Sequence, residues 1–165
     1  MKIRDLIRRF DFWQLFKISG VAIQKPFFII PTLRATKKTM IICDALYGNL
    51  HHHHGKANAF RHALWNILIC QKTLLQSKDE DKSIVWAQKI TDLHEKLAPN
   101  KAIEEAMDLH NNRLGREYFK KLKAASEEET ISFLKEKTKI AKLVSDIEEI
   151  DSFCNDLVYL SDENF

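Results

Sequence analysis

The sequence predicts an all-α fold, a single-domain irregular bundle of about six to seven helices. Its 165 residues include only four Gly and three Pro, whereas sheet-rich domains need many of both in their turns. Apolar residues recur at helical spacing in several segments. With 45% apolar and 30% charged residues, the composition is that of a globular domain rather than of a disordered or membrane-spanning chain.

The N-terminal region, 1–33, is basic and is expected to begin with an amphipathic helix over 3–18. Its apolar face is interpreted as core, with a membrane-surface helix and peripheral membrane contact as the alternative. Residues 20–31 are expected to form a connector, because Pro26 and Pro31 interrupt a helix.

A second helix is predicted over 33–46, ending before Gly48. The His-rich loop 47–55 follows, with adjacent histidines at 51–54. This run is interpreted either as a weak metal-binding tract or as a solvated loop.

The motif-bearing core is predicted over 56–124, with helices at 56–76, 82–96 and 100–124. Gly115 lies inside the last of these, where it costs ~1 kcal/mol relative to Ala. Such a glycine indicates the close approach of another backbone or of a ligand.

The C-terminal region, 125–165, is acidic. Ser126 and Glu129 form a capping box for a further helix, and a last helix is predicted over 141–160. Residues 1–60 carry ten Lys/Arg against three Asp/Glu, a net +7, and residues 124–165 carry four Lys against eleven Asp/Glu, a net −7. The two ends either pack on each other or offer the basic front to an anionic surface.

The three cysteines, Cys43, Cys70 and Cys154, are scattered. Their spacing argues against a disulfide framework and a zinc ribbon, and favours small buried residues. No secretory signal and no transmembrane segment is evident. The chain is therefore expected to be cytoplasmic as synthesised, and to need a non-classical secretion system if it is exported.

Polar residues form stripes on two of the predicted core helices. Asn58, His62 and Asn66 follow at i, i+4 and i+8, so they share one helix face, which is predicted to point inward. In the fifth helix, one face is predicted to carry the residues at i, i+3, i+4 and i+7, namely Asp108, Asn111, Asn112 and Gly115. His110 lies about 100° away from that face.

These residue types predict a hydrolytic or metal site. A divalent ion (Zn, or Mg, Mn or Ca) would take its ligands from His62, Glu95, Asp108 and His110. Without a metal, a His–carboxylate pair activates water as a general base. The candidate catalytic residues are His62, His94, Glu95 and Asp108. The candidate substrate-binding residues are Arg61, Trp65, Asn111, Asn112 and Arg116, with an arginine holding phosphate.

The strings GKANAFRHALWN, DLHE and MDLHNNRLGREYF resemble an uncharacterised bacterial helical domain family. That family occurs free-standing and at the C-terminal ends of polymorphic-toxin-like proteins. The resemblance covers roughly 56–119 and points to the same candidate residues. It implies a helical domain, and it suggests an effector or toxin role with an immunity protein as partner.

A weaker similarity is to helical metal-dependent phosphohydrolases of the HD type. His62, His94-Glu95 and Asp108 follow the order of that family's ligands. Glu95 replaces the aspartate of its His-Asp pair, and the last aspartate comes early.

Three functional hypotheses follow. The first is a hydrolase that acts on a phosphate ester, either a phospholipid or a nucleotide. The second is a non-enzymatic interaction module in which the polar cluster is structural. The third is a membrane-active toxin that works through residues 1–33.

Overall fold

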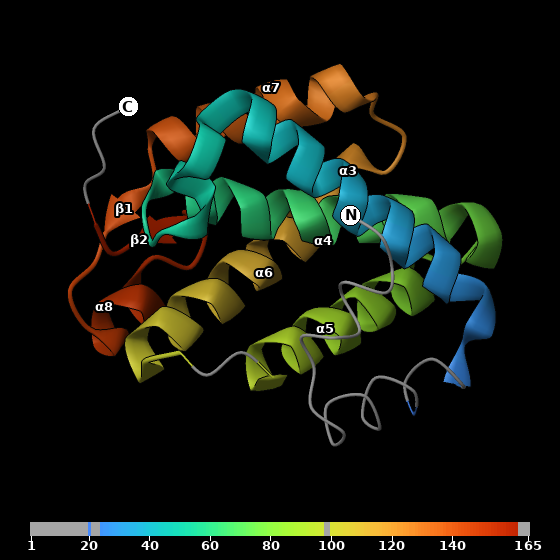
Figure 1. The fold of residues 1–165 in the computed structure, drawn as a ribbon, viewed down its shortest axis with the longest axis horizontal. Coiled ribbons are helices and arrows are strands. Elements are labelled where there is room, and N and C mark those ends of the chain that lie inside the picture. The colour runs from blue at the N-terminus through green and yellow to red at the C-terminus, as the bar shows by residue number, and fades with distance from the viewer. Residues whose placement is uncertain (1–19, 21–23, 98–99, 162–165) are drawn as a thin grey trace.

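Helix α4, Lys56–Ser77, is the axis of the fold (Figure 1). The computed structural model describes residue 20 and residues 24–97 and 100–161. Within this part of the chain, α4 contacts α3, α5, α6 and α7. More than half of its side chains are buried, because α4 carries apolar and small polar residues on all of its faces. The predicted all-α fold class is confirmed.

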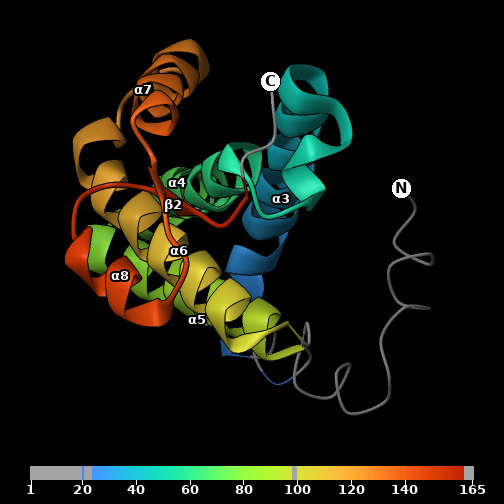
Figure 2. The ribbon, with the colours of Figure 1, turned by 90° about the vertical axis from the view of Figure 1, so that its left-hand side faces the viewer.

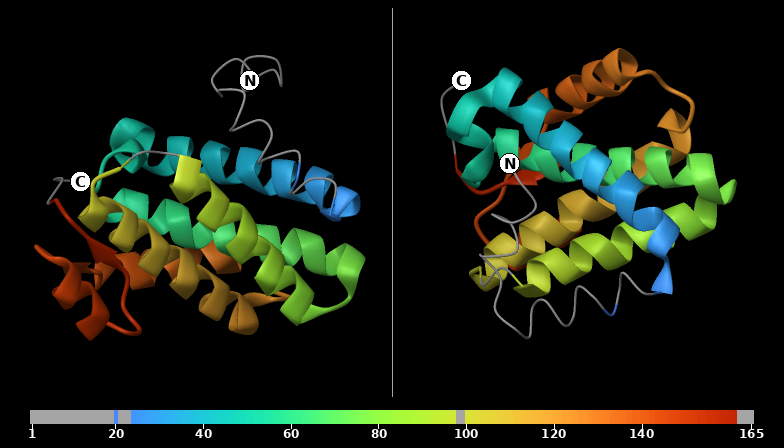
Figure 3. Two further views of the ribbon diagram at one scale, coloured as in Figure 1. Left: turned by 90° about the horizontal axis from the view of Figure 1, so that it is seen from below. Right: turned by 45° about the vertical axis from the view of Figure 1, so that its right-hand side comes forward.

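Helix α3, Pro26–Tyr47, crosses α4 and reaches the start of α5, where Phe28 packs edge-on against Trp86 (Figure 3). The predicted connector over 20–31 is therefore wrong for most of its length. Pro26 stands at the first helical position, where its missing N–H costs nothing. Pro31 lies inside the helix and is buried, so its packing offsets the one backbone hydrogen bond that it removes.

Helices α5, Glu80–Leu97, and α6, Ala102–Leu122, pack against α4 and against each other. Both match the predicted helices to within a few residues. Helix α7, Glu127–Lys139, begins with the predicted capping box: the backbone N–H of Glu129 donates to Ser126 Oγ (3.2 Å), and that of Ser126 donates to Glu129 Oε2 (2.7 Å).

The C-terminal segment is not the helix that was predicted over 141–160. It contains strand β1, Lys142–Leu143, the short helix α8, Ile147–Ser152, and strand β2, Val158–Tyr159, with the two strands parallel. The segment lies beside α6 (Figure 2). Asn111 explains the difference, because its side-chain amide accepts from the N–H of Val158 (3.0 Å) and donates to its carbonyl (2.9 Å). This pairing holds β2 in an extended conformation.

The His-rich loop contains a 3₁₀ helix, η1, Gly48–His52. Gly48 ends α3, as predicted, with φ of +54° and its N–H donating to the carbonyl of Asp44. Cys43 and Cys70 are buried as expected, whereas Cys154 is exposed, which corrects that prediction. The helix predicted over 3–18 lies outside the described residues. Among those described, no helix is long and apolar enough to cross a membrane.

Candidate metal centre

Three side chains from three helices meet in the interior: His62 from α4, Glu95 from the last turn of α5 and Asp108 from α6. Their residues are only 2%, 4% and 3% exposed. One ligand atom from each lies within 4.8 Å of the others. The inward orientation predicted for this stripe of α4 is confirmed, because Asn58 and Asn66 are buried as well.

Gly115 allows α6 to approach α4 closely enough for this meeting. A Cβ atom at this position would lie 2.5 Å from the carbonyl oxygen of Ala63 and 2.9 Å from Cβ of Asn66. Neither contact is sterically allowed, and the first is to backbone. The close approach expected at Gly115 is therefore that of another helix backbone.

A chain of amide hydrogen bonds connects the three helices behind the site. Arg116 donates to Oδ1 of Asn66 (3.0 Å), Asn66 donates to Oδ1 of Asn112 (2.7 Å), and Asn112 donates to Oε1 of Glu95 (3.1 Å). Each amide uses both its donor and its acceptor, so the polar atoms of this chain are satisfied despite their burial.

The tautomer of His62 is fixed by two neighbours. Arg61 is always a donor, and its guanidinium lies 2.8 Å from Nε2 of His62. Nε2 therefore carries the lone pair, and Nδ1–H donates to Oδ1 of Asn112 (3.2 Å). An imidazole held in this way offers Nε2 as a metal ligand or as a base.

Asp108 meets the lone-pair side of His62. Its Oδ1 lies 3.3 Å from Nε2, but this atom is buried and has no hydrogen-bond partner in the described part of the chain. The approach satisfies the distance of an ion pair and not the direction of a hydrogen bond. A buried carboxyl oxygen without a hydrogen-bond partner favours a proton on Asp108 or a cation beside it.

The burial of these groups changes their proton affinities. Desolvation, with some contribution from Glu95, raises the pKa of Asp108 to about 8. Desolvation likewise raises the pKa of Glu95 to about 7, against the lowering effect of the hydrogen bond from Asn112. Desolvation and the positive charge of Arg61 lower the pKa of His62 well below its usual value. At neutral pH these shifts favour a neutral imidazole and protonated carboxyl groups, and a divalent cation would have to displace those protons to gain carboxylate ligands.

One separation, that between His62 and Asp108, suits a transition-metal ion, whereas Oε1 of Glu95 lies 3.7 Å from the other ring nitrogen, Nδ1. Two ligands about 2.05 Å from a tetrahedral zinc ion lie about 3.3 Å apart. The distance between Nε2 of His62 and Oδ1 of Asp108 is 3.3 Å. One imidazole and two carboxylates leave a coordination position for water, as in catalytic rather than structural zinc sites.

Other predicted site residues lie at the edge of this centre. Arg61 is half-buried and hydrogen-bonded to His62. His94 is exposed, and its ring meets that of Trp65 edge-on at 5.2 Å between centroids. Arg116 donates to Asn66 and Thr91, so it belongs to the supporting network rather than to an open anion site.

His110 and Asn111 lie apart from the centre. Nε2 of His110 bonds to the carbonyl of Asp156 (2.9 Å), and Asn111 clamps Val158. The helical period places His110 about 200° round from Asp108, on the opposite side of α6. Asn111 lies about 100° from Asn112, and its side chain bonds Val158, so the face that was expected to include it does not. His110 is thus not gathered with the three other predicted ligands.

Sequence reasoning assigned no role to Asn66 and Thr91, although both touch Arg116. For Asn66 a signal existed, because it continues the stripe of Asn58 and His62. For Thr91 none did, since a threonine on an amphipathic helix is usually read as solvent-facing or core.

A search of curated proteins and a search of solved structures each returned no match. The resemblance noted in the strings of the core region has a counterpart in one family profile, which matches residues 19–142. That match spans α3 to α6, α7 and the first residue of β1, and so includes every residue of the centre. On this evidence the chain belongs to the family described as a domain of unknown function, DUF6973.

Proposed function

We propose that this protein is a metal-dependent hydrolase of phosphate esters, in which His62, Glu95 and Asp108 hold one divalent cation. The observation that carries the proposal is the convergence of these three side chains from α4, α5 and α6, within 4.8 Å and out of solvent. Burying two carboxyl groups beside an imidazole is costly unless a cation or protons compensate them.

The donor set favours Zn²⁺ or Mn²⁺ among the divalent ions. Imidazole nitrogen is a poor ligand for Mg²⁺ and Ca²⁺, which prefer oxygen. When bound, such an ion supplies a water of pKa about 7 and polarises a phosphoryl oxygen.

The residues around the cation would orient its ligands, bind the phosphate and transfer a proton. Asn112 holds His62 in the tautomer that presents Nε2, and it orients Glu95 through its Nδ2. Arg61, the half-buried cation next to the cluster, would bind phosphoryl oxygens in the bidentate manner of guanidinium groups. His94, exposed beside Trp65, would return a proton to the leaving group.

Substrate must reach a centre that is buried. Two surface cavities of about 400 and 410 Å³ are lined by other residues, and neither includes a ligand of the centre. Access would therefore need a local opening of the helices, as loops and domains of other enzymes open and close around their substrates. The ester must then enter on the side of Arg61 and His94, whose side chains reach the surface.

The test combines metal analysis with hydrolysis of bis(p-nitrophenyl) phosphate by the full chain, purified without a histidine tag. Glu95→Gln and Asp108→Asn keep the side-chain shapes and remove the charges. We expect each to lower the bound Zn²⁺ or Mn²⁺ at the centre and to reduce hydrolysis by at least about 10²-fold. His110→Ala is the matched control, since it removes a buried imidazole of α6 that faces Asp156. Full activity in both carboxylate variants would refute the proposal.

The second candidate is an interaction module in which the same cluster only specifies the fold. It is favoured by the amide chain from Arg116 to Glu95, which is fully satisfied. It predicts that Asp108→Asn changes the stability of the metal-depleted protein but binds as much metal as the wild type. The effector role, the immunity partner and the membrane contact stay predictions.

A further inference from the structure

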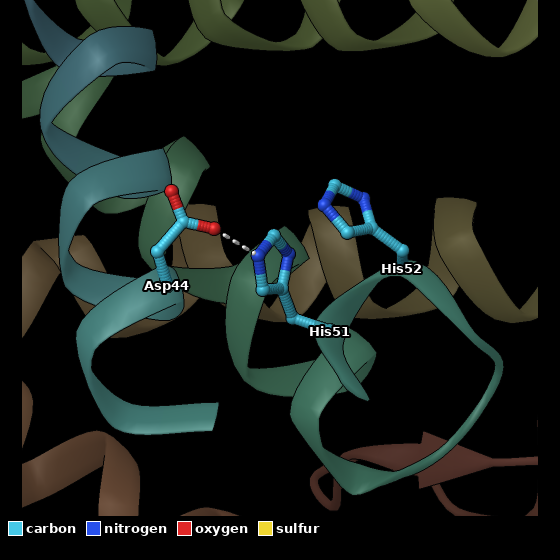
Figure 4. Close-up of side chains that lie close together, drawn as sticks. All are labelled: Asp44, His51 and His52. Carbon is cyan, nitrogen blue, oxygen red and sulfur yellow. Dashed lines mark hydrogen bonds and ion pairs between the residues drawn. The ribbon is translucent and has the colours of Figure 1, made fainter. Parts of the chain in front are cut away.

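A second group of metal-ligand type lies where α3 passes into η1. It consists of Asp44, near the end of α3, and the adjacent residues His51 and His52 of η1 (Figure 4). One ligand atom from each lies within 4.8 Å of the others. His51 Nε2 is 2.8 Å from Asp44 Oδ1, and the rings of His51 and His52 are 4.0 Å apart between centroids.

The local backbone explains how two neighbouring histidines can face one point. Gly48 takes a positive φ and reverses the chain, and the 3₁₀ turn then stacks the two rings at 39° to each other. In a strand, adjacent side chains would point to opposite faces. Figure 4 shows the second ring nitrogen of His51 turned toward the ring of His52.

The inner histidine is held in place and has spare ligand capacity. His51 is 0% exposed, and Asp44 orients its ring as carboxylates orient metal-binding histidines. The other nitrogen, Nδ1, is buried and has no hydrogen-bond partner in the described part of the chain. By contrast Asp44 and His52 are exposed, so an ion from solution can reach this group directly.

We propose that Asp44, His51 and His52 form a second binding site for a divalent transition-metal ion, distinct from the buried centre. Imidazole nitrogens favour Zn²⁺, Ni²⁺ or Cu²⁺ over Mg²⁺ and Ca²⁺. The ion would bind Nδ1 of His51 and a ring nitrogen of His52, while Asp44 holds the His51 ring through Nε2, and water would complete the coordination.

The site is set by geometry and not by the number of histidines in the run. The other two histidines are not part of the group. Nε2 of His54 lies 3.5 Å from Oε1 of Glu104 of α6. A flexible histidine tract would instead use all four members interchangeably, and it would have no need of Asp44.

The test uses the untagged full chain carrying Glu95→Gln and Asp108→Asn, so that binding at the buried centre is suppressed. Zn²⁺ affinity is measured by titration calorimetry, and Co²⁺ binding by its visible absorption. On this background we add Asp44→Asn, His52→Ala or the control His53→Ala. All three positions are exposed, and circular dichroism confirms that each variant is folded.

We expect one equivalent of Zn²⁺ to bind, and Asp44→Asn and His52→Ala to weaken it at least about tenfold. His53→Ala should leave the affinity within a factor of two. Equal losses in His52→Ala and His53→Ala would show a tract without a defined site. Unchanged affinity in Asp44→Asn, or no binding by the background protein, would overturn the proposal. None of these outcomes depends on whether the buried centre is a hydrolase.

Discussion

The two candidate metal sites of this protein use similar side chains in opposite settings. The ligands of the buried centre come from α4, α5 and α6 and are held by hydrogen bonds from Asn112. The surface group takes both of its imidazoles from adjacent residues, and the side chain of Asp44, which orients one of them, is 60% exposed. The residues of the buried centre are far apart in the sequence, so the packing of three helices brings them together. The two histidines of the surface group are neighbours, so the local turn is enough to bring them together.

This difference determines how each site is linked to folding. The geometry of the buried centre disappears when the helices separate, so an ion bound there stabilises the whole fold. The surface group loses less of its metal affinity on unfolding, because His51 and His52 remain neighbours in any conformation. The following experiments sharpen or break this contrast.

The largest expected effect is that of Gly115→Val. The new side chain would collide with the backbone of Ala63 and force α6 away from α4. We expect a loss of about 3 kcal/mol or more in the free energy of unfolding, at the upper end for overpacking, together with loss of metal from the buried centre. Chemical denaturation measures the first and metal analysis the second. Gly20→Ala is the control, since nothing lies within 4 Å of its position, and equal stability of the two variants would contradict the close packing.

Saturation with Zn²⁺ should stabilise the folded protein through the buried centre. At a free concentration 100 times the dissociation constant, the gain is about 2.7 kcal/mol. Asp108→Asn should abolish most of this gain, whereas Asp44→Asn should leave most of it. Thermal or urea unfolding with and without EDTA measures it. If Asp44→Asn removes the larger share, the contrast between the two sites is reversed.

Asn112→Ala should cost about 2 kcal/mol even without metal. The variant leaves Glu95, His62 and Asn66 each without one buried hydrogen-bond partner, and stranded polar groups cost ~1–3 kcal/mol. It should also weaken metal binding. Asn111→Ala is the matched control: it frees the C-terminal strand at Val158 but should keep the metal affinity. Hydrogen exchange of residues 156–160 checks that separation.

The smallest effect concerns pH. The pKa values of Asp108, about 8, and Glu95, about 7, lie above those of unfolded carboxyl groups, so the folded state holds protons that the unfolded state has lost. The stability of the metal-depleted protein should therefore fall as pH rises from about 6.5 to about 8, and each proton held only by the folded state adds about 1.4 kcal/mol per pH unit to the slope. His62, whose pKa is lowered, is neutral in both states there. Asp108→Asn should flatten the dependence, and a profile unaffected by that variant would argue against a buried carboxyl group.

Much of the helical scaffold was predictable from local signals. The capping box of Ser126 and the stop at Gly48 are chemical features of a few neighbouring residues, and both are confirmed. The inward stripe of Asn58, His62 and Asn66 followed from the helical period alone. Gly115 predicted a close contact, although only the structure shows that the contacting backbone is that of α4.

The failures share one cause, which is tertiary packing that local patterns do not encode. Pro31 is accommodated inside α3 because burial offsets its missing hydrogen bond. The segment 141–160 has helical composition, but Asn111 gives the backbone of Val158 a better partner. His110 faces the same segment, because its ring bonds to the backbone carbonyl of Asp156. Asp44 was not singled out, because the two histidines near it follow a reversal of the chain.

The contact between Arg61 and His62 has a consequence for the order of events. The guanidinium occupies the one lone pair that the imidazole can give to a cation. An arriving metal ion must displace it, and the freed arginine then lacks an acceptor beside a newly positive centre. An incoming anion supplies that acceptor. Under the proposed function, loading would therefore be sequential, with the cation before the anion, and Arg61 would stay turned toward His62 until the ion is bound.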